Sequence, residues 1–238
     1  MTTMQTADHT VKSFDTELKH LVQEIAQMGG LAEAELAQAI DALARRDSEA
    51  ATSVIESDRR LDTMEQEVST LAVRILALRQ PMAADLREVV AAIKISSDIE
   101  RIGDYSKNIA KRALQLNQLA PLRPVSSIPR MGRLAQQIVK DVLDAYVEKD
   151  ANLALAAWRR DEEIDDLYTS LFRELLTYMM EDPRNIGPST HLLFIAKNIE
   201  RIGDHATNIA ETVHFLALGR SIEETSPKGD TTNVALDG

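Results

Sequence analysis

Apolar residues recur every three or four positions over long stretches of the chain, which is the period of an amphipathic α-helix. One stretch has the spacing of a coiled-coil seam, and its members are Val54, Leu61, Met64, Val68, Leu71, Ile75 and Leu78. Two later stretches carry an isoleucine-rich seam, formed by Ile95, Ile99, Ile102, Ile109 and Leu116 and by Ile195, Ile199, Ile202, Ile209 and Leu216. The pattern therefore predicts an all-α fold built from long helices.

The chain carries an internal repeat. Residues 99–110 read IERIGDYSKNIA and residues 199–210 read IERIGDHATNIA, so nine of twelve positions agree at an offset of 100. A looser match at an offset of 103 relates residues 44–62 to residues 147–165. We interpret the chain as two similar halves that are related by a pseudo-two-fold axis. The change of offset indicates that three residues were gained or lost in a connector.

Three helices are expected in each half. The first of them spans residues 13–46. Asp47 and Asp150 stand where the second helices should begin, and aspartate is a favoured N-cap because its oxygen accepts a free backbone N–H. Pro81 and Pro183 should end these second helices, since proline cannot continue the hydrogen-bond ladder.

These signals divide the chain into five segments. A flexible N-terminus over 1–12 precedes the first three-helix bundle over 13–119. A linker over 120–130 contains three prolines and is expected to be extended. The second three-helix bundle covers 131–218, and a tail without periodicity, expected to be disordered, covers 219–238.

The amino-acid composition and net charge exclude several kinds of partner and site. The 38 acidic and 27 basic side chains give a net charge of −11, and the isoelectric point is near 5.0. Nucleic acids and anionic membranes attract basic faces, so cations or basic protein surfaces are the expected partners. Because there is no cysteine, disulfides, thiolate zinc sites and iron–sulfur clusters are excluded. The chain shows neither a secretory signal nor a long apolar run, which predicts a cytoplasmic protein without membrane insertion.

The polar faces of the predicted helices carry paired carboxylates. Four pairs occur at a spacing of four residues, namely Asp58 with Asp62, Glu100 with Asp104, Asp161 with Asp165, and Glu200 with Asp204. A helical wheel puts Glu100 and Asp104 almost opposite the isoleucine seam, on an outward face. Carboxylates at this spacing lie roughly 5–6 Å apart and repel each other unless a cation sits between them. The pairs are either plain solvated faces or ligands of magnesium, manganese, iron or zinc.

The repeat favours the metal hypothesis. Both halves retain these acids at positions where Lys, Gln or Ser would serve equally well on a helix face that is merely exposed to solvent. We call Asp58, Asp62, Glu100 and Asp104 the first acidic centre, and Asp161, Asp165, Glu200 and Asp204 the second acidic centre. A di-iron centre of the Glu-x-x-His type is disfavoured. Its two motifs, Glu17 with His20 and Glu211 with His214, do not repeat between the halves.

Four further residues have structural interpretations. Gly103 and Gly203 lie inside a helix, where glycine costs about 1 kcal/mol relative to alanine, so a close helix contact is expected there. Trp158 should fill the core, and His205 should lie on the surface. No phosphate-binding glycine loop or hydrolase motif is present.

The repeated ERIGD core and two (Glu/Asp)-x-x-x-Asp motifs per half resemble the PhoU family over residues 13–218. The opening Phe14-Asp15-x-Glu17-Leu18 and the Met28-Gly29 pair extend this resemblance. The resemblance implies two pseudo-symmetric three-helix bundles whose acidic centres bind multinuclear iron or zinc, or manganese or magnesium. It also suggests Asn108, Asn208 and Arg87 as weaker candidate ligands.

The resemblance further implies a function without catalysis. Members of this family repress the phosphate-starvation response and restrain phosphate uptake, by linking the ATPase subunit of the phosphate ABC transporter to a sensor histidine kinase. We expect a cytoplasmic homodimer that reaches the inner membrane only through these partners. Two alternatives remain open, a carboxylate-bridged metal enzyme and a helical adaptor without metal.

Overall fold

The computed structural model describes residues 3–120 and 127–223, and within these ranges the chain contains helices and no strand. The α-helices are α1 (Thr3–Arg45), α2 (Ser48–Arg79), α3 (Ala83–Asn117), α4 (Ser127–Glu148), α5 (Ala151–Arg159), α6 (Asp161–Glu181) and α7 (Ile186–Leu218). A 3₁₀ turn, η1 (Pro183–Asn185), connects α6 to α7. The predicted all-α class is confirmed.

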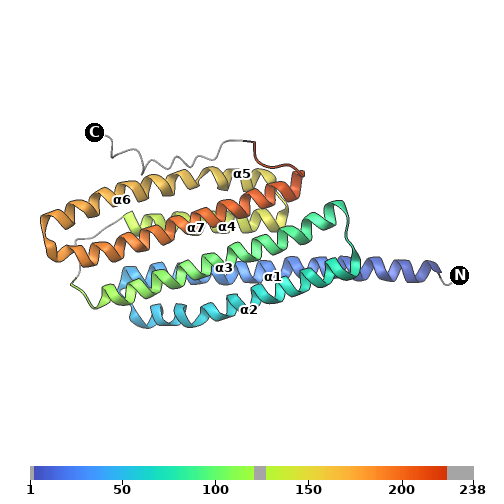
Figure 1. Cartoon of the computed structure of the whole chain (residues 1–238), viewed down its shortest axis with the longest axis horizontal. Helices are drawn as coiled ribbons and strands as arrows, with labels where there is room; N and C mark the ends of the chain where they lie inside the picture. Colours follow the sequence, from blue (N-terminus) through green and yellow to red (C-terminus); the bar gives the residue numbers. More distant parts are fainter. Residues whose placement is uncertain (1–2, 121–126, 224–238) are drawn as a thin grey trace.

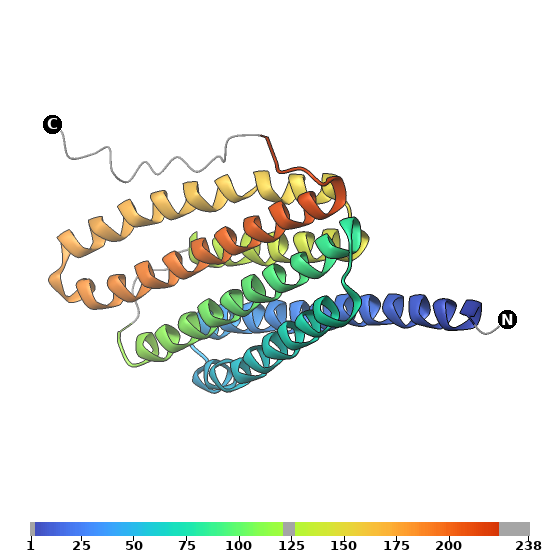
Figure 2. The same cartoon turned by 45° about the vertical axis from the view of Figure 1, so that its right-hand side comes forward.

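The helices form two bundles that lie side by side (Figure 1). Helices α1, α2 and α3 make the first bundle, and α4, the α5–α6 pair and α7 make the second. All helices run roughly along the long axis of the molecule, and α3 lies beside α7 at its centre in both views (Figures 1 and 2). The predicted pair of three-helix bundles is therefore confirmed.

The helix ends follow the predicted caps. Asp47 Oδ1 accepts hydrogen bonds from the backbone N–H groups of Glu49 and Ala50, both at 3.0 Å. Asp150 Oδ1 accepts the equivalent bonds in the second bundle, at 2.8 and 3.1 Å. The residue before each aspartate, Arg46 or Lys149, takes a left-handed backbone with φ near 55° (55° and 54°). The two halves thus turn the chain in the same way.

Two boundaries differ from the prediction. Helix α1 begins at Thr3 rather than at residue 13, because residues 3–12 contain no proline or glycine to stop it. Helix α4 begins at Ser127, so the predicted linker is shorter; Pro129 falls in the first turn, where no backbone donor is needed. The rest of the predicted linker, residues 121–126, and most of the predicted tail, residues 224–238, lie outside the described residues.

The second helix of the second bundle is interrupted, which the sequence pattern did not predict. Arg160 separates α5 from α6 with 3₁₀-like hydrogen bonds on both sides, from its own N–H to Ala157 and from Glu163 to its carbonyl. The guanidinium of Arg160 pairs with Asp141 at 2.8 Å. Helix α6 then starts with three acidic residues, which favour a new helix N-terminus through the helix dipole.

The predicted isoleucine seams are buried. Their eight isoleucines are fully inaccessible to solvent, and Trp158 is only 3% exposed, as predicted. The α2 seam is also buried over most of its length, but its last member, Leu78, is 66% exposed. Leu78 lies in the last turn of α2, next to Arg79, which pairs with Glu17 of α1.

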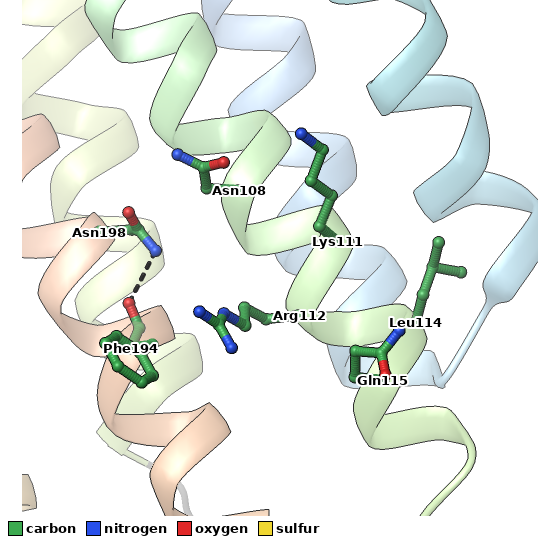
Figure 3. Close-up of a pocket in the computed structure, with 7 residues that line it drawn as sticks. All are labelled: Asn108, Lys111, Arg112, Leu114, Gln115, Phe194 and Asn198. Atoms are coloured by element: carbon green, nitrogen blue, oxygen red, sulfur yellow. Dashed lines mark hydrogen bonds between the residues drawn. The ribbon is translucent and has the colours of Figure 1, made fainter.

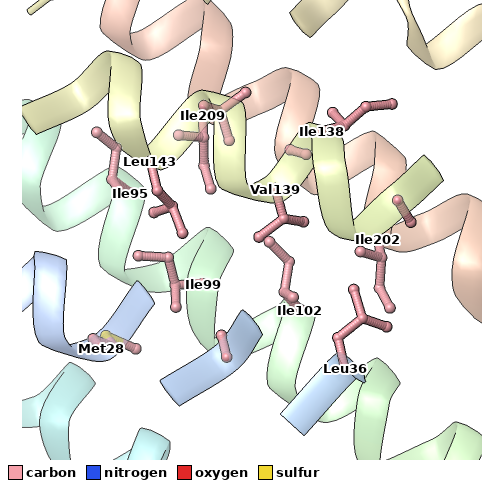
Figure 4. Close-up of a cluster of buried hydrophobic side chains, with 14 of the residues drawn as sticks. Met28, Leu36, Ile95, Ile99, Ile102, Ile138, Val139, Leu143, Ile202 and Ile209 are labelled. Atoms are coloured by element: carbon pink, nitrogen blue, oxygen red, sulfur yellow. The ribbon is translucent and has the colours of Figure 1, made fainter. Parts of the chain in front are cut away.

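The two bundles share one hydrophobic core. Side chains of α1, α3, α4 and α7 interdigitate across the boundary between the bundles (Figure 4). The packing is reciprocal: a methyl group on Gly29 of α1 would lie 2.8 Å from Leu143 of α4, and one on Gly132 of α4 would lie 2.8 Å from Ile40 of α1. Both residue pairs are related by the offset of 103, so they support the predicted pseudo-two-fold relationship.

Candidate metal centres

The paired carboxylates lie between helices rather than on an outward face. Asp58 is 4% exposed and Asp161 is 3% exposed, and the other six carboxylates are half-buried. The helical-wheel prediction of an exposed stripe was therefore wrong. A wheel describes one helix at a time, whereas here the acidic edge of α2 meets that of α3, and each helix shields the other.

In the first acidic centre a lysine joins two of the acids. Lys107 Nζ lies 2.5 Å from Asp58 Oδ2 on α2 and 2.7 Å from Asp104 Oδ1 on α3. Its side chain is 20% exposed, and that of Asp58 is 6% exposed. Burial opposes its charge, but the hydrogen bonds to Asp104 and Asp58 raise the pKa of Lys107 above its ordinary value. The ammonium group thus fills the place of a cation between α2 and α3.

The pKa of Glu100 is also affected by its neighbours in this centre. Burial raises the pKa of Glu100, and the negative charge of Asp104 adds to this rise, while Arg101 opposes it. The charges of Asp62 and Asp58 raise this pKa further. Arg101 lies 3.4 Å from Glu100 and 3.1 Å from Asp104, which is the surface salt bridge typical of such a spacing. The other three acids of the first centre therefore all act on Glu100.

A fifth carboxylate joins the first centre from α1. Glu35 is 2% exposed, and its Oε1 accepts a hydrogen bond from Ser57 Oγ at 2.6 Å. Its Oε2 is buried and has no hydrogen-bond partner. Burial raises the pKa of Glu35 to about 7, the Ser57 hydrogen bond lowers it, and the charge of Asp58 raises it. A buried carboxylate oxygen without a partner is costly, and it marks a place for a proton or a cation.

The second acidic centre is built around a glycine. A methyl group on Gly203 of α7 would collide with Asp161 Oδ1, so the absence of a side chain lets this buried carboxylate approach the α7 backbone beside Asp204. The predicted close helix contact at Gly203 is confirmed. Gly103 confirms it for the first bundle, where the methyl group would meet Leu61 instead.

A lysine also pairs with an acid of the second centre. Lys197 Nζ donates a hydrogen bond to Glu200 Oε1 at 2.8 Å, forms an ion pair with Oε2 at 2.7 Å, and lies 5.4 Å from the centre of the Tyr168 ring. Its side chain is 42% exposed. This lysine therefore pairs with one acid of α7 and is more exposed to solvent than Lys107.

Aligning the two halves shows which residues near the repeated acids differ between them. The offset of 103 places Ile138 where the first half has Glu35, and the offset of 100 places Thr207 where it has Lys107. Lys197 in turn corresponds to Ser97. The two centres thus keep equivalent acids but differ in their neighbouring charges.

The donor set of both centres fits a hard or intermediate cation, because it consists of oxygen atoms from buried and half-buried carboxylates. The unpartnered Oε2 of Glu35 supports this fit for the first centre. Within residues 3–120 and 127–223, however, no three His, Asp or Glu side chains converge in the geometry of a metal site. Metal ligation by the eight acids therefore stays a prediction, and it requires side-chain rearrangement.

The Glu-x-x-His residues do not form a common site. Glu17 binds Arg79 at 2.8 Å, and His20 lies 3.5 Å from Glu24. In α7, Glu211 accepts a hydrogen bond from the Trp158 indole at 3.1 Å. His214 is 8% exposed, and its Nδ1 lies 3.1 Å from the Arg220 carbonyl oxygen. Each of these four side chains therefore contacts a different partner.

His205 lies between the bundles and not on an outer surface. Its Nδ1 is 2.8 Å from Asp98 Oδ1, and its ring stacks at 5.6 Å on Tyr105, the equivalent residue of the first half. Asn208 donates to the same Asp98 at 3.4 Å. The single-helix pattern missed this contact because only the pairing of α3 with α7 covers this face.

A groove of about 540 Å³ follows the junction of α3 and α7 (Figure 3). It is lined by Asn108, Lys111, Arg112, Leu114, Gln115, Phe194 and Asn198. The Arg112 guanidinium lies 4.4 Å from the centre of the Phe194 ring. Burial and the charge of Arg112 lower the pKa of His191 nearby. Asn108 thus lines a basic groove, whereas Arg87 lines a separate groove together with Lys94 and Glu211.

Sequence reasoning missed Glu35 and Lys107, although both carry a signal. Glu35 stands in the buried seam of α1, three residues after Ala32, at a position whose counterpart Ile138 is apolar. A charged residue at a seam position indicates a special environment. Lys107 replaces Thr207 in an otherwise repeated motif, so a comparison of the halves directs attention to it.

Among the described residues, no helix combines the length and apolarity needed to cross a membrane.

The family model described as PhoU domain matches residues 25–113 and 128–213. The phosphate-specific transport system accessory protein PhoU homolog of Caulobacter vibrioides is 55% identical over 224 residues, which are 94% of this chain and 97% of that protein. The phosphate-specific transport system accessory protein PhoU of Serratia marcescens is 41% identical, over 90% of this chain and 88% of its own length.

Solved structures agree with this assignment. The crystal structure of PhoU from Pseudomonas aeruginosa matches with a TM-score of 0.84 at 41% identity, covering 87% of this chain and 100% of that chain. The phosphate transport system regulatory protein PhoU from Streptococcus pneumoniae matches with a TM-score of 0.81 at 31% identity, covering 89% and 100%. The chain therefore belongs to the PhoU family of phosphate transport accessory proteins.

Proposed function

We propose that this protein is a negative regulator of phosphate signalling and phosphate uptake that acts by protein contact. In this proposal it is a metal-binding adaptor between the ATPase subunit of the phosphate ABC transporter and a sensor histidine kinase. It acts as a cytoplasmic homodimer that reaches the inner membrane through these partners, and it is not an enzyme. The observation that carries the proposal is family membership, since relatives named as transport accessory proteins match nearly the whole chain.

The acidic centres supply the metal part of the proposal. Asp58, Asp62, Glu100 and Asp104 would hold ions in the first bundle, and Asp161, Asp165, Glu200 and Asp204 would hold them in the second. A bound divalent or trivalent ion such as iron, zinc, manganese or magnesium supplies positive charge that relieves carboxylate repulsion. The acids on α2 and α3 would then cross-link these helices, and those on α6 and α7 would do the same in the second bundle.

The metal part is tested by stoichiometry. Replacing Glu100 and Asp104 together by alanine should remove about half of the metal bound by protein purified without chelator, as measured by elemental analysis. The matched variant replaces Glu200 and Asp204 and should remove the other half. Unchanged metal content in both variants would contradict the assignment of these acids as ligands.

A metal-free helical adaptor is the second candidate. The observation that favours it is that no three ligating side chains converge in the described residues. If protein purified without chelator contains no metal and binds none on titration, this second candidate becomes the better one. The adaptor role itself does not depend on that result.

The regulatory part is tested in cells and with purified partners. Deletion of the gene should derepress a phosphate-starvation reporter in phosphate-rich medium. A pull-down with the transporter ATPase and the sensor kinase, with and without metal, should recover both partners. Normal repression in the deletion strain would contradict the proposed role.

A further inference from the structure

Lys107 occupies the space between the two helices that contribute acids to the first centre. Its ammonium group reaches Asp58 on α2 at 2.5 Å and Asp104 on α3 at 2.7 Å. These contacts are charge-assisted hydrogen bonds, and Asp58 is almost completely withdrawn from water. A metal ion held by the same two carboxylates would lie next to the ammonium group, and the repulsion between the two cations opposes their binding together.

We propose that Lys107 is a built-in competitor of metal ions at the first acidic centre, so that an ion binds Asp58 and Asp104 only when the lysine leaves them. This inference rests on the metal-binding part of the proposed function and deepens it. It assigns an ammonium group that bridges two helices to the first centre, because the equivalent residue of the second centre is the uncharged Thr207 and Lys197 there contacts an acid of its own helix.

Glu35 gives an independent reason to expect a cation beyond the lysine. Its Oε2 is buried without a hydrogen-bond partner. The charges of Asp58 and Asp62 raise the pKa of Glu35, and the charge of Lys107 lowers it. One ammonium group therefore leaves the first centre with an unsatisfied oxygen. The second half has Ile138 at this position, so this additional buried carboxylate belongs to the first centre only.

The test isolates the first centre. In a background with Glu200→Ala and Asp204→Ala, Mn²⁺ binding is measured from the free-ion signal in electron paramagnetic resonance. Lys107→Thr, which copies the second half, should lower the dissociation constant for Mn²⁺ by about 10- to 100-fold, the range expected for removing competing hydrogen bonds to charged groups.

The matched control is Lys111→Thr. Lys111 lies one turn further along α3, and its ammonium group makes no ion pair within the described part of the chain. This variant changes the net charge by the same amount, so it measures the general effect of losing one positive charge. We expect it to change the dissociation constant much less than Lys107→Thr does.

The outcomes separate the two proposals. Tighter binding in Lys107→Thr than in Lys111→Thr supports the competitor role, also when the parent binds no ion. Equal dissociation constants in all three proteins overturn the competitor role but leave metal binding standing. If neither the parent nor Lys107→Thr binds Mn²⁺, the competitor role and metal binding at this centre both fail.

A second measurement uses the wild-type chain and covers the case in which Lys107→Thr does not fold. Acetylation by an amine-reactive ester, followed by peptide mass spectrometry, reports how free each lysine is. Saturating Mn²⁺ should increase the acetylation rate of Lys107 severalfold and leave that of Lys111 unchanged. The same measurement in the Glu200→Ala, Asp204→Ala protein restricts Mn²⁺ to the first centre. An unchanged rate for Lys107 in that protein, once it is shown to hold Mn²⁺, would overturn the inference.

Discussion

The two acidic centres carry equivalent acids in different electrostatic surroundings. In the first centre the compensating lysine bridges two helices and contacts two aspartates. In the second centre the lysine contacts a glutamate on its own helix and is twice as exposed, with 42% of its side chain accessible against 20%. A repeated acidic motif therefore does not imply two equal sites, because the neutralising charges have changed independently of the acids.

Burial explains why these small sequence changes matter. Charges attract each other more strongly where water is excluded, and a buried charge without a partner is costly. Asp58 and Glu35 are both almost fully buried in the first bundle. The equivalent of Glu35 in the second bundle is Ile138, which is fully buried and needs no compensation. The first bundle thus contains a buried carboxylate that the second bundle lacks.

The largest expected effect comes from removing the bridging lysine. In metal-free protein, Lys107→Thr should lower the free energy of unfolding by about 2–4 kcal/mol, because a buried Asp58 loses its counter-charge. Lys197→Ser, the matched change in the second centre, should cost less than about 1 kcal/mol, as exposed pairs do. Urea unfolding at pH 7 with a chelator measures both. Equal losses would remove the distinction between the centres.

The second prediction concerns Glu35. Its pKa is raised from 4.5 in the unfolded chain to about 7, so the protonated form is favoured by folding. The contribution of the protonated Glu35 to the free energy of unfolding has its full value below pH 4.5 and is lost as the pH rises through 7. Glu35→Gln should therefore stabilise metal-free protein by about 1–3 kcal/mol at pH 8 and have almost no effect near pH 4.5.

A control of opposite sign is available for this prediction. The hydrogen bond from Arg79 lowers the pKa of Glu17, so its contribution is present at neutral pH and is lost as the pH falls. Glu17→Gln should therefore destabilise the protein at pH 8. Urea unfolding between pH 5.5 and 8.5 should show a gain for Glu35→Gln that grows with pH. A gain independent of pH would contradict a titrating Glu35.

The smallest expected effect separates the two interior glycines. Gly103→Ala and Gly203→Ala should each cost about 0–2 kcal/mol, because overpacking is partly offset by the higher helix propensity of alanine. In the first bundle the new methyl group collides with the apolar Leu61 and lies 3.5 Å from Glu35 Oε2, an ordinary contact, whereas in the second bundle it collides with the carboxylate of Asp161. Gly203→Ala should therefore weaken metal binding at its own centre more than Gly103→Ala does, as measured by Mn²⁺ titration. Equal weakening at both centres would show that helix separation, not the displaced carboxylate, controls binding.

Much of the fold could be predicted because helices are local structures. The isoleucine seams follow the helical period, and Asp47 and Asp150 cap their helices through bonds to residues two and three positions later. The interruption at Arg160 could not be predicted in this way. Its guanidinium pairs with Asp141 on another helix, a contact that no local pattern contains.

By itself, then, the sequence determined the helical class, the duplication and the positions of the eight acids, since period, repeats and residue identity are properties of the chain. Only the tertiary structure decided that Asp58 and Asp161 are buried, that Lys107 joins α2 to α3, and that Glu35 enters the first centre from α1. The physical reason is that burial and electrostatic environment depend on neighbouring helices. Residues far apart in the sequence create that environment only after the bundles have packed.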